Sequence, residues 1–314
     1  MRLSDDAPSI CVLSLWPLVT VTIETHADGE DDIYFNAGGQ GLWIARMAQS
    51  LGARTTFCGP LGGHTGMLAK ALIEEEGIGL RAIPTAGSNG SYIDDRRSGE
   101  RGRMASQTAP KLSRHEVDDL YDAALAEGLK AGTLVISGQI EEQVMPAERI
   151  AMLARDLHRN EVNVIADVGG PTLRALSGGI SILKVSHEEL IEAELARDDS
   201  HSQILAALKD LAGHAAHCVV ASRADAGALA IFDGQVYEVD QPAFEAIDTS
   251  GAGDSMTAGL AVCRAMGCDA EDTLRTAAAA GALNVTRRGR GTGARRDIQE
   301  VRKLVGIRRL RDGE

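Results

Sequence analysis

The most informative stretch of this chain reads Asp248-Thr249-Ser250-Gly251-Ala252-Gly253-Asp254-Ser255, followed directly by Met256-Thr257-Ala258-Gly259. The Gly-Ala-Gly turn presents bare backbone N–H groups, and a helix rich in small residues is predicted to start immediately after it. Free N–H groups and the positive end of a helix dipole together form a site for an anion such as phosphate. We therefore expect the amides of Gly251, Ala252 and Gly253 to hold a phosphate group.

A carboxylate, that of Asp254, stands at the same helix start. Negative charge beside a phosphate opposes simple binding, but it is useful if Asp254 takes a proton from a hydroxyl that attacks the phosphate. The alternative is a helix that is merely capped after a glycine turn. The length and specificity of the motif favour the catalytic interpretation. For Asp248, a capping role and a role linked to a cation both remain open.

The motif resembles the C-terminal signature D-T-x-G-A-G-D of the ribokinase-like (PfkB) carbohydrate kinases. Residues 38–46 resemble the N-terminal G-G-K-G-x-N-x-A signature of that family, and residues 184–190 resemble its K-P-N-x-x-E-L segment. Ser137-Gly138 and the run G-A-G-D-S-M are most similar to the branch of 1-phosphofructokinase and tagatose-6-phosphate kinase. The resemblance covers residues 10–300, approximately.

Short apolar strands and helical segments alternate along the chain. Strands are predicted at 10–15, 19–24, 55–58, 134–136, 162–166, 182–185 and 218–221, a hairpin at 228–239, and helices at 39–51, 65–76, 114–128, 146–159, 187–197, 201–212, 252–266 and 270–285. This rhythm predicts an α/β fold with a doubly wound, mostly parallel sheet and helices on both faces. The resemblance implies a single ribokinase-like domain over 1–314, with a small β-sheet lid formed by segments near 17–36 and 81–108.

The composition argues against several classes of protein. A net charge of -13 argues against a nucleic-acid partner, and the lack of a long apolar run argues against a membrane span. The five scattered cysteines predict reduced thiols in a cytoplasmic protein and no metal framework, and an acidic N-terminus argues against export. The arginine-rich stretch Arg287–Arg311 is expected to form a solvated or salt-bridged surface.

The resemblance implies ATP as phosphate donor, together with Mg²⁺. Lys184 is expected near the nucleotide phosphates, and Glu189 matches the glutamate that organises Mg²⁺ through water, with Ser186 in place of an asparagine. Ser186 and Glu189 also form a helix capping box in their own right, and the two interpretations are compatible. The adenine pocket is expected to include Ser222, Ala224, Gly227 and Asn284. Ala224 replaces a glycine, which costs about 1 kcal/mol if the position needs a positive φ.

The substrate end departs from the family pattern. The expected substrate residues are Trp16, Thr20, Gly38, Gly39, Gln40, Trp43 and Glu141. Thr20 stands in place of the aspartate that grips sugar hydroxyls, Gln40 in place of a lysine and Trp43 in place of an asparagine. Asn89 stands near the usual position of a phosphate-binding arginine. Glu141 matches a glutamate that accepts hydrogen bonds from sugar hydroxyls in ribokinases, although a solvated role is also open.

A buried phosphate dianion needs a fixed cation, and the positions above supply none. The sequence therefore favours an unphosphorylated, sugar-like substrate, with Trp43 stacking on it. Three functions stay open: an ATP-dependent kinase of a sugar hydroxyl, a nucleoside kinase of the same fold, and a catalytically weak binding or regulatory relative. The intact G-A-G-D run favours a kinase. The resemblance also implies a homodimer formed through the lid sheets.

Overall fold

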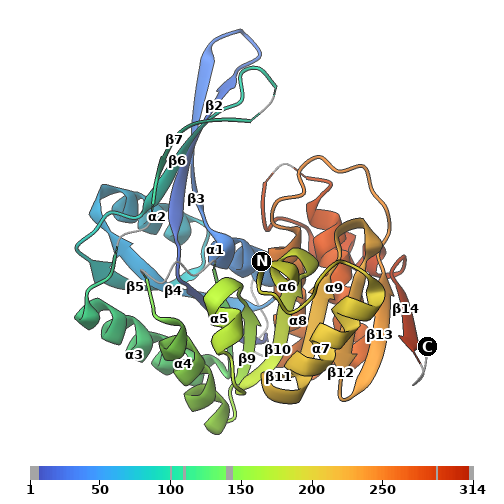
Figure 1. Ribbon diagram of the computed structural model, residues 1–314. Coiled ribbons are helices and arrows are strands. Elements are labelled where there is room, and N and C mark those ends of the chain that lie inside the picture. The colour runs from blue at the N-terminus through green and yellow to red at the C-terminus, as the bar shows by residue number, and fades with distance from the viewer. Residues whose placement is uncertain (1–6, 100, 109–110, 139–143, 288, 311–314) are drawn as a thin grey trace.

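The computed structural model describes residues 7–99, 101–108, 111–138, 144–287 and 289–310 (Figure 1). Within these residues a ten-stranded sheet has the order β14-β13-β12-β11-β10-β9-β8-β1-β4-β5. Its strands are β1 (Ser9–Ser14), β4 (Arg54–Gly62), β5 (Gly79–Thr85), β8 (Thr133–Ser137), β9 (Asn163–Asp167), β10 (Ile180–Ser186), β11 (Ala216–Ser222), β12 (Ala228–Phe232), β13 (Gln235–Asp240) and β14 (Gly306–Leu310). Neighbouring strands are parallel along the run β5-β4-β1-β8-β9-β10-β11 of this order. Strands β12, β13 and β14 add an antiparallel edge beside β11.

Helices cover both faces of the large sheet. They are α1 (Gln40–Ser50), α2 (Gly63–Glu75), α3 (Arg114–Ala131), α4 (Ala147–Arg159), α5 (Gly170–Ala175), α6 (His187–Glu192), α7 (His201–His214), α8 (Ala252–Met266), α9 (Ala270–Asn284) and α10 (Arg295–Arg302), with a short 3₁₀ turn at Ala224–Ala226. In β1, Cys11 and Leu13 pack with residues of α3, α4 and α7, whereas Ile10 and Val12 pack with residues of α1, α8 and α9. Because successive strand residues point to opposite faces, a strand buried on both faces is apolar throughout. The predicted doubly wound α/β architecture is confirmed.

A second, four-stranded sheet stands away from the large one (Figure 1). It has the order β3-β2-β6-β7 and consists of β2 (Leu18–Thr25), β3 (Asp31–Gly38), β6 (Gly90–Asp95) and β7 (Gly102–Gln107). The expected segment 81–108 starts too early for this small sheet. Residues 81–85 belong to β5, which pairs in parallel with β4 and places Ile83 in the core of the large sheet.

The two faces of the small sheet differ in chemistry. Cross-strand partners alternate between the set Thr20, Thr22, Asn36 and Asp94 and the set Val21, Ile23, Phe35 and Ile93. The first set lines a pocket that faces helix α1 and the loop after α9. The second set forms the apolar outer face, where Phe35 is 51% exposed.

The arginine-rich C-terminal stretch is more ordered than expected. Helix α10 buries Ile298 and Val301 against the core, and β14 pairs with β13 at the edge of the large sheet. Exposed arginines of β14 bond to that neighbour, as Arg308 does to Glu238. The stretch is therefore part of the fold, and its charges cover one edge of it.

Candidate active site

The glycine turn before α8 has the geometry that an anion site requires. Gly251 is the N-cap of α8, with φ +84°, a left-handed conformation that favours glycine. Within the described residues, no acceptor is found for the amides of Gly251 and Gly253, and the amide of Ala252 makes only a long bond of 3.4 Å to Thr249. These amides stand at the positive end of α8.

Asp254 lies in the first turn of the same helix and is buried. Its Oδ1 has no hydrogen-bond partner among the described residues. Burial raises the pKa of Asp254 to about 8, and the charge of Asp167 adds to this effect, although Lys184 and Arg290 oppose it. An unpaired buried carboxyl group that titrates near neutral pH is typical of a general base.

The amine of Lys184 lies against the glycine turn and is held by a buried carboxylate. Lys184 Nζ donates to Asp167 Oδ1 at 3.2 Å, and Thr257 Oγ1 donates to Asp167 Oδ2 at 2.7 Å. A Cβ added to Gly253 would lie 2.7 Å from Lys184 Nζ, so that only glycine lets the amine approach this closely. Burial alone would lower the pKa of Lys184, but Asp167, Glu189 and Asp254 outweigh it and raise the pKa above its ordinary value.

Ser186 and Glu189 form the capping box that the sequence predicts at the start of α6. Ser186 N donates to Glu189 Oε2 at 2.7 Å, and Glu189 N donates to Ser186 Oγ at 3.1 Å. Burial raises the pKa of Glu189, whereas the charge of Lys184 lowers it. The charges of Glu189 and Asp254 therefore both act on the amine of Lys184.

The loop expected at the adenine pocket contains an unusual alanine. Ala224 has φ +46°, the left-handed conformation anticipated for the glycine that it replaces. Gly227 has φ +76°, and a Cβ there would collide with the carbonyl oxygen of Val239. Ser222 ends β11, and its Oγ makes a long bond of 3.4 Å to the carbonyl of Val185.

Asn284, expected to contact the nucleotide, makes two hydrogen bonds within the chain. Its Nδ2 donates to Ser250 O at 2.9 Å, and its Oδ1 accepts from Gly291 N at 2.9 Å. The side chain is buried at the end of α9. Asn284 therefore ties the glycine turn to the loop after α9. Asp248 likewise has a structural bond, because its Oδ1 accepts from Ser250 N at 2.9 Å, which supports the capping role.

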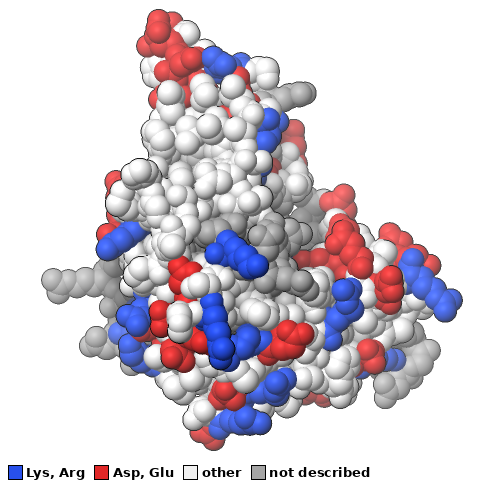
Figure 2. All heavy atoms as spheres, turned by 60° about the vertical axis from the view of Figure 1, so that its left-hand side comes forward, with Lys and Arg blue, Asp and Glu red and all other residues white. Residues whose placement is uncertain are grey.

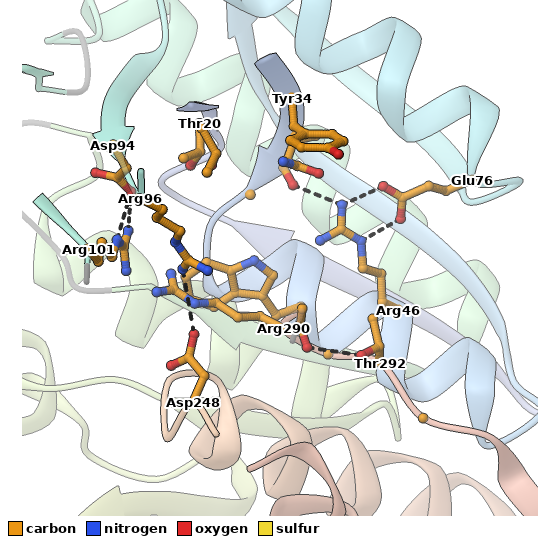
Figure 3. A pocket seen from close by; sticks show the side chains of 18 of the residues that line it. Thr20, Tyr34, Arg46, Glu76, Asp94, Arg96, Arg101, Asp248, Arg290 and Thr292 are labelled. Atoms are coloured by element: carbon orange, nitrogen blue, oxygen red, sulfur yellow. Dashed lines mark hydrogen bonds and ion pairs between the residues drawn. The ribbon is translucent and has the colours of Figure 1, made fainter. Parts of the chain in front are cut away.

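A pocket of about 830 Å³ opens between the small sheet, helix α1 and the loop after α9 (Figure 3). Of the expected substrate residues, Thr20, Gly38 and Trp43 line it. Gly39 is the N-cap of α1 and Gln40 is its first residue, and neither lines the pocket. Trp16 also stays outside it and packs against the core of the large sheet. Glu141 lies outside the described residues.

The expectation that this pocket lacks cations is wrong. Arg96 and Arg101, which flank the loop between β6 and β7, and Arg290, in the loop after α9, all line it (Figure 3). Asn89, at the position of the missing arginine, is buried and structural: its Nδ2 donates to the carbonyls of Pro17 and Pro60. The charge is supplied from other elements, which become neighbours only in the folded chain.

Asp167, the buried partner of Lys184, was not predicted from the sequence as a residue of the site. Its position directly after an apolar strand was an available signal, since strand C-termini meet at the ligand edge of such sheets. The described residues contain no cluster of three or more His, Cys, Asp or Glu side chains that could hold a metal ion by itself. No helix among them is both long and apolar enough to cross a membrane.

The chain is similar in sequence to known sugar-phosphate kinases. The chain is 26% identical to the 1-phosphofructokinase of Haloferax volcanii, with 78% of each chain covered. It is 28% identical to the ATP-dependent 6-phosphofructokinase isozyme 2 of Mycobacterium tuberculosis, over 86% of this chain and 80% of that one.

Solved structures share the fold. Phosphofructokinase-2 from Escherichia coli, in complex with potassium, superposes with a TM-score of 0.84 at 24% identity, over 95% of this chain and 99% of that chain. The ribokinase of Arabidopsis thaliana, complexed with ribose and ATP, gives a TM-score of 0.74 at 23% identity, with 95% and 99% covered. The family model described as pfkB family carbohydrate kinase matches residues 19–296. The chain therefore belongs to the pfkB family of carbohydrate kinases.

Proposed function

We propose that the protein is an ATP-dependent phosphotransferase that phosphorylates a hydroxyl group of a sugar or sugar-like small molecule, with Asp254 as general base. The observation that carries this proposal is the buried, unbonded Oδ1 of Asp254 beside the free amides of Gly251 and Gly253. A binding protein has no chemical need for a carboxylate next to an anion site. A kinase uses that carboxylate to accept the proton of the attacking hydroxyl.

The proposed step transfers the γ-phosphoryl group of ATP to the acceptor hydroxyl. The acceptor oxygen forms a bond to the γ-phosphorus, the bond from that phosphorus to the bridging oxygen of ADP breaks, and the hydroxyl proton moves to Asp254. The amides of Gly251, Ala252 and Gly253 act as an anion hole for the transferred group. Such fixed donors supply most of the catalysis in phosphoryl transfer, because little covalent work is needed.

Lys184 adds a fixed positive charge under the glycine turn. The Asp167 bond holds its amine in place and keeps it protonated. A charged amine at this point neutralises phosphate charge that develops in the transition state. Lys184 is therefore assigned to the nucleotide phosphates.

Mg²⁺ is assigned to the substrate complex Mg·ATP. This ion is commonly held by one or two carboxylates together with nucleotide phosphates and water. Glu189 suits this role because only its Oε2 is bonded in the capping box, which leaves Oε1 for a water molecule of the ion. The adenine is assigned to the loop that contains Ser222, Ala224 and Gly227.

The acceptor is assigned to the pocket beside Trp43. Relatives named as phosphofructokinases, and a solved neighbour that holds ribose and ATP, support a sugar. A nucleoside that stacks on Trp43 is the second candidate, but the guanidinium of Arg290 already stands 4.6 Å from the centre of the Trp43 ring. The Arg290 guanidinium therefore already covers one face of the Trp43 indole, which favours a sugar over a stacked nucleoside as the acceptor.

We also assign the apolar outer face of the small sheet to a homodimer contact. Ile33, Phe35 and Ile93 are exposed there, and Figure 2 shows few charged groups on the side of the small sheet that comes forward, below its charged tip. Exposed apolar patches of this kind mark protein contacts. Phosphofructokinase-2 of Escherichia coli has a structure described as a tetrameric inhibited form, so related chains do assemble.

The proposal is tested by ADP formation from Mg·ATP with a panel of sugars, sugar phosphates, sugar acids and nucleosides. Turnover that requires both an acceptor and Mg²⁺, with phosphate appearing on the acceptor, supports it. Tight ATP binding without transfer to any member of the panel would favour the regulatory alternative.

A further inference from the structure

The guanidinium of Arg290 is held in place without using its hydrogen-bond donors. It lies over Trp43, and a Cβ added to Gly251 would lie 3.2 Å from Arg290 Cβ. No hydrogen bond or ion pair of Arg290 is found among the described residues. A guanidinium carries five N–H donors, so a half-buried one that has no acceptor presents them to a ligand.

Two further arginines reach the same pocket from the small sheet. The Nε of Arg96 is buried without a hydrogen-bond partner, and its Nη2 is 4.0 Å from Asp248 Oδ2, at the limit of an ion pair (Figure 3). Arg101 pairs with Asp94, which Arg103 also contacts. One buried carboxylate is therefore shared by two guanidinium groups.

At this point of the pocket, the arginines carry positive charge that the neighbouring carboxylates do not fully neutralise. Burial, followed by the nearby charge of Arg101, lowers the pKa of Arg290, and Arg96 acts in the same direction. Asp248 opposes them, but it also accepts a bond from the amide of Ser250. Glu24 lines the pocket as well, near the far end of β2. Cations that face one another in a partly buried site are stabilised by an anion between them.

We propose that the acceptor is an anionic sugar derivative, whose phosphate or carboxylate group is bound by Arg290, Arg96 and Arg101. The inference rests on the proposed function, because it names the substrate class for the same pocket. Arg290 has a special position in this arrangement. Its backbone end packs on the glycine turn and its guanidinium on Trp43, so it links the phosphate end of the site to the acceptor end.

The contributing elements also explain how the anion would affect the site. Arg96 and Arg101 lie in the β6–β7 loop of the small sheet, whereas Arg290 lies in the loop after α9, on the body that carries Asp254. An anion bound between them joins the two parts and fixes the acceptor hydroxyl over the turn. Fixing two reactants in this way is a large source of rate acceleration.

The test compares matched acceptors with Mg·ATP: fructose, fructose 1-phosphate, fructose 6-phosphate and gluconate. The phosphate esters and the sugar acid distinguish the two anion chemistries. We expect kcat/KM for at least one anionic acceptor to exceed that for fructose by about 100-fold or more. Arg290→Gln should lower this value by about 10- to 100-fold, mainly through KM, and Arg290→Lys should restore part of it.

Arg114→Gln is the matched control, because Arg114 is exposed on α3 and lies outside the pocket. Arg96→Gln and Arg101→Gln should act in the same direction as Arg290→Gln, whereas the control should match the wild type. Efficient turnover of neutral sugars alone would overturn the inference and leave the proposed kinase function intact. So would an anionic acceptor whose KM is unchanged in Arg290→Gln.

A binding measurement covers the case in which the panel contains no true acceptor. Fluorescence of the two tryptophans is titrated with each sugar phosphate and with gluconate, without ATP. Saturable binding that weakens about tenfold or more in Arg290→Gln, but not in Arg114→Gln, supports the inference even if no phosphate is transferred. No saturable response to any anion overturns it.

Discussion

The amine of Lys184 bonds to Asp167 at 3.2 Å and sits directly under Gly253. Asp167 is one of the largest influences on two site pKa values: its charge raises the pKa of Asp254 and that of Lys184. The proposed base and the proposed phosphate cation therefore both have pKa values that depend on one buried carboxylate, which is bonded to Lys184 and Thr257.

Asp167→Asn should therefore move the whole pH–rate profile. Loss of the negative charge lowers the pKa of Asp254, which shifts the acid limb to lower pH, and lowers that of Lys184, which shifts the alkaline limb the same way. We also expect kcat to fall by about 10- to 100-fold, because the amine loses its anchor. Asp119→Asn, an exposed carboxylate on α3, is the control. A profile that keeps its position would contradict the role of Asp167.

The buried carboxyl group of Asp254 should also cost stability at alkaline pH. Its folded pKa of about 8 lies above the ordinary value of 3.8. The unfolded chain loses this proton first as the pH rises, so the penalty begins above the ordinary pKa and is complete above the folded one. Asp254→Asn removes it. The Tm of the ligand-free variant should match the wild type near pH 4 and exceed it increasingly towards pH 9, as measured by calorimetry. Equal differences at both pH values would count against the buried charge.

The adenine loop offers a matched pair of backbone tests. Ala224 has φ +46°, and a glycine there removes strain of about 1 kcal/mol at an entropic cost of 0.4–1 kcal/mol, roughly. Ala224→Gly should leave the free energy of unfolding unchanged or raise it slightly. Gly227→Ala should lower it by more than about 2 kcal/mol, because its Cβ would meet the carbonyl of Val239. Chemical denaturation gives the free energy of unfolding of both variants. Equal changes in the two variants would contradict the backbone roles assigned to Ala224 and Gly227.

The outer face of the small sheet predicts the assembly state. Phe35→Glu places a charge in the middle of the apolar patch, so that a dimer formed through this face should dissociate. Leu304→Glu makes the same chemical change at a 61% exposed position near the C-terminus and should leave the assembly intact. Light scattering after size-exclusion chromatography gives the masses. A Phe35→Glu protein that stays dimeric would place the contact elsewhere.

Local patterns predicted the elements of this molecule better than they predicted its contacts. Most strands of the large sheet, the capping box at Ser186 and the turn at Gly251 were accessible because each depends on neighbouring residues, whereas β5 was assigned to the lid. The resemblance raised the possibility of a positive φ at Ala224, because the family pattern has a glycine there, and the structure shows φ +46°. Strand β14 and helix α10 were missed, since their arginines hide a short apolar pattern that includes Ile298 and Val301.

The charge of the acceptor pocket could not be predicted in this way. Arg96 and Arg101 are separated from Arg290 by almost two hundred positions, and only the packing of the small sheet over the body brings them together. The uncharged residues at the positions of the family pattern, Gln40, Trp43 and Asn89, suggested a pocket without cations. The bonds of the Asn284 amide to Ser250 and Gly291 could not be predicted for a similar reason, because they join segments that meet only in the folded chain.

The central claim is that Asp254 is the base of a phosphoryl transfer, and one comparison tests it most directly. ADP formation is measured for the wild type and for Asp254→Asn with the best acceptor of the panel, alongside ATP binding by calorimetry. The account predicts that the variant binds ATP as the wild type does and loses about 10²- to 10⁴-fold in kcat. A variant that retains wild-type turnover would show that Asp254 does not take the proton and would contradict the account.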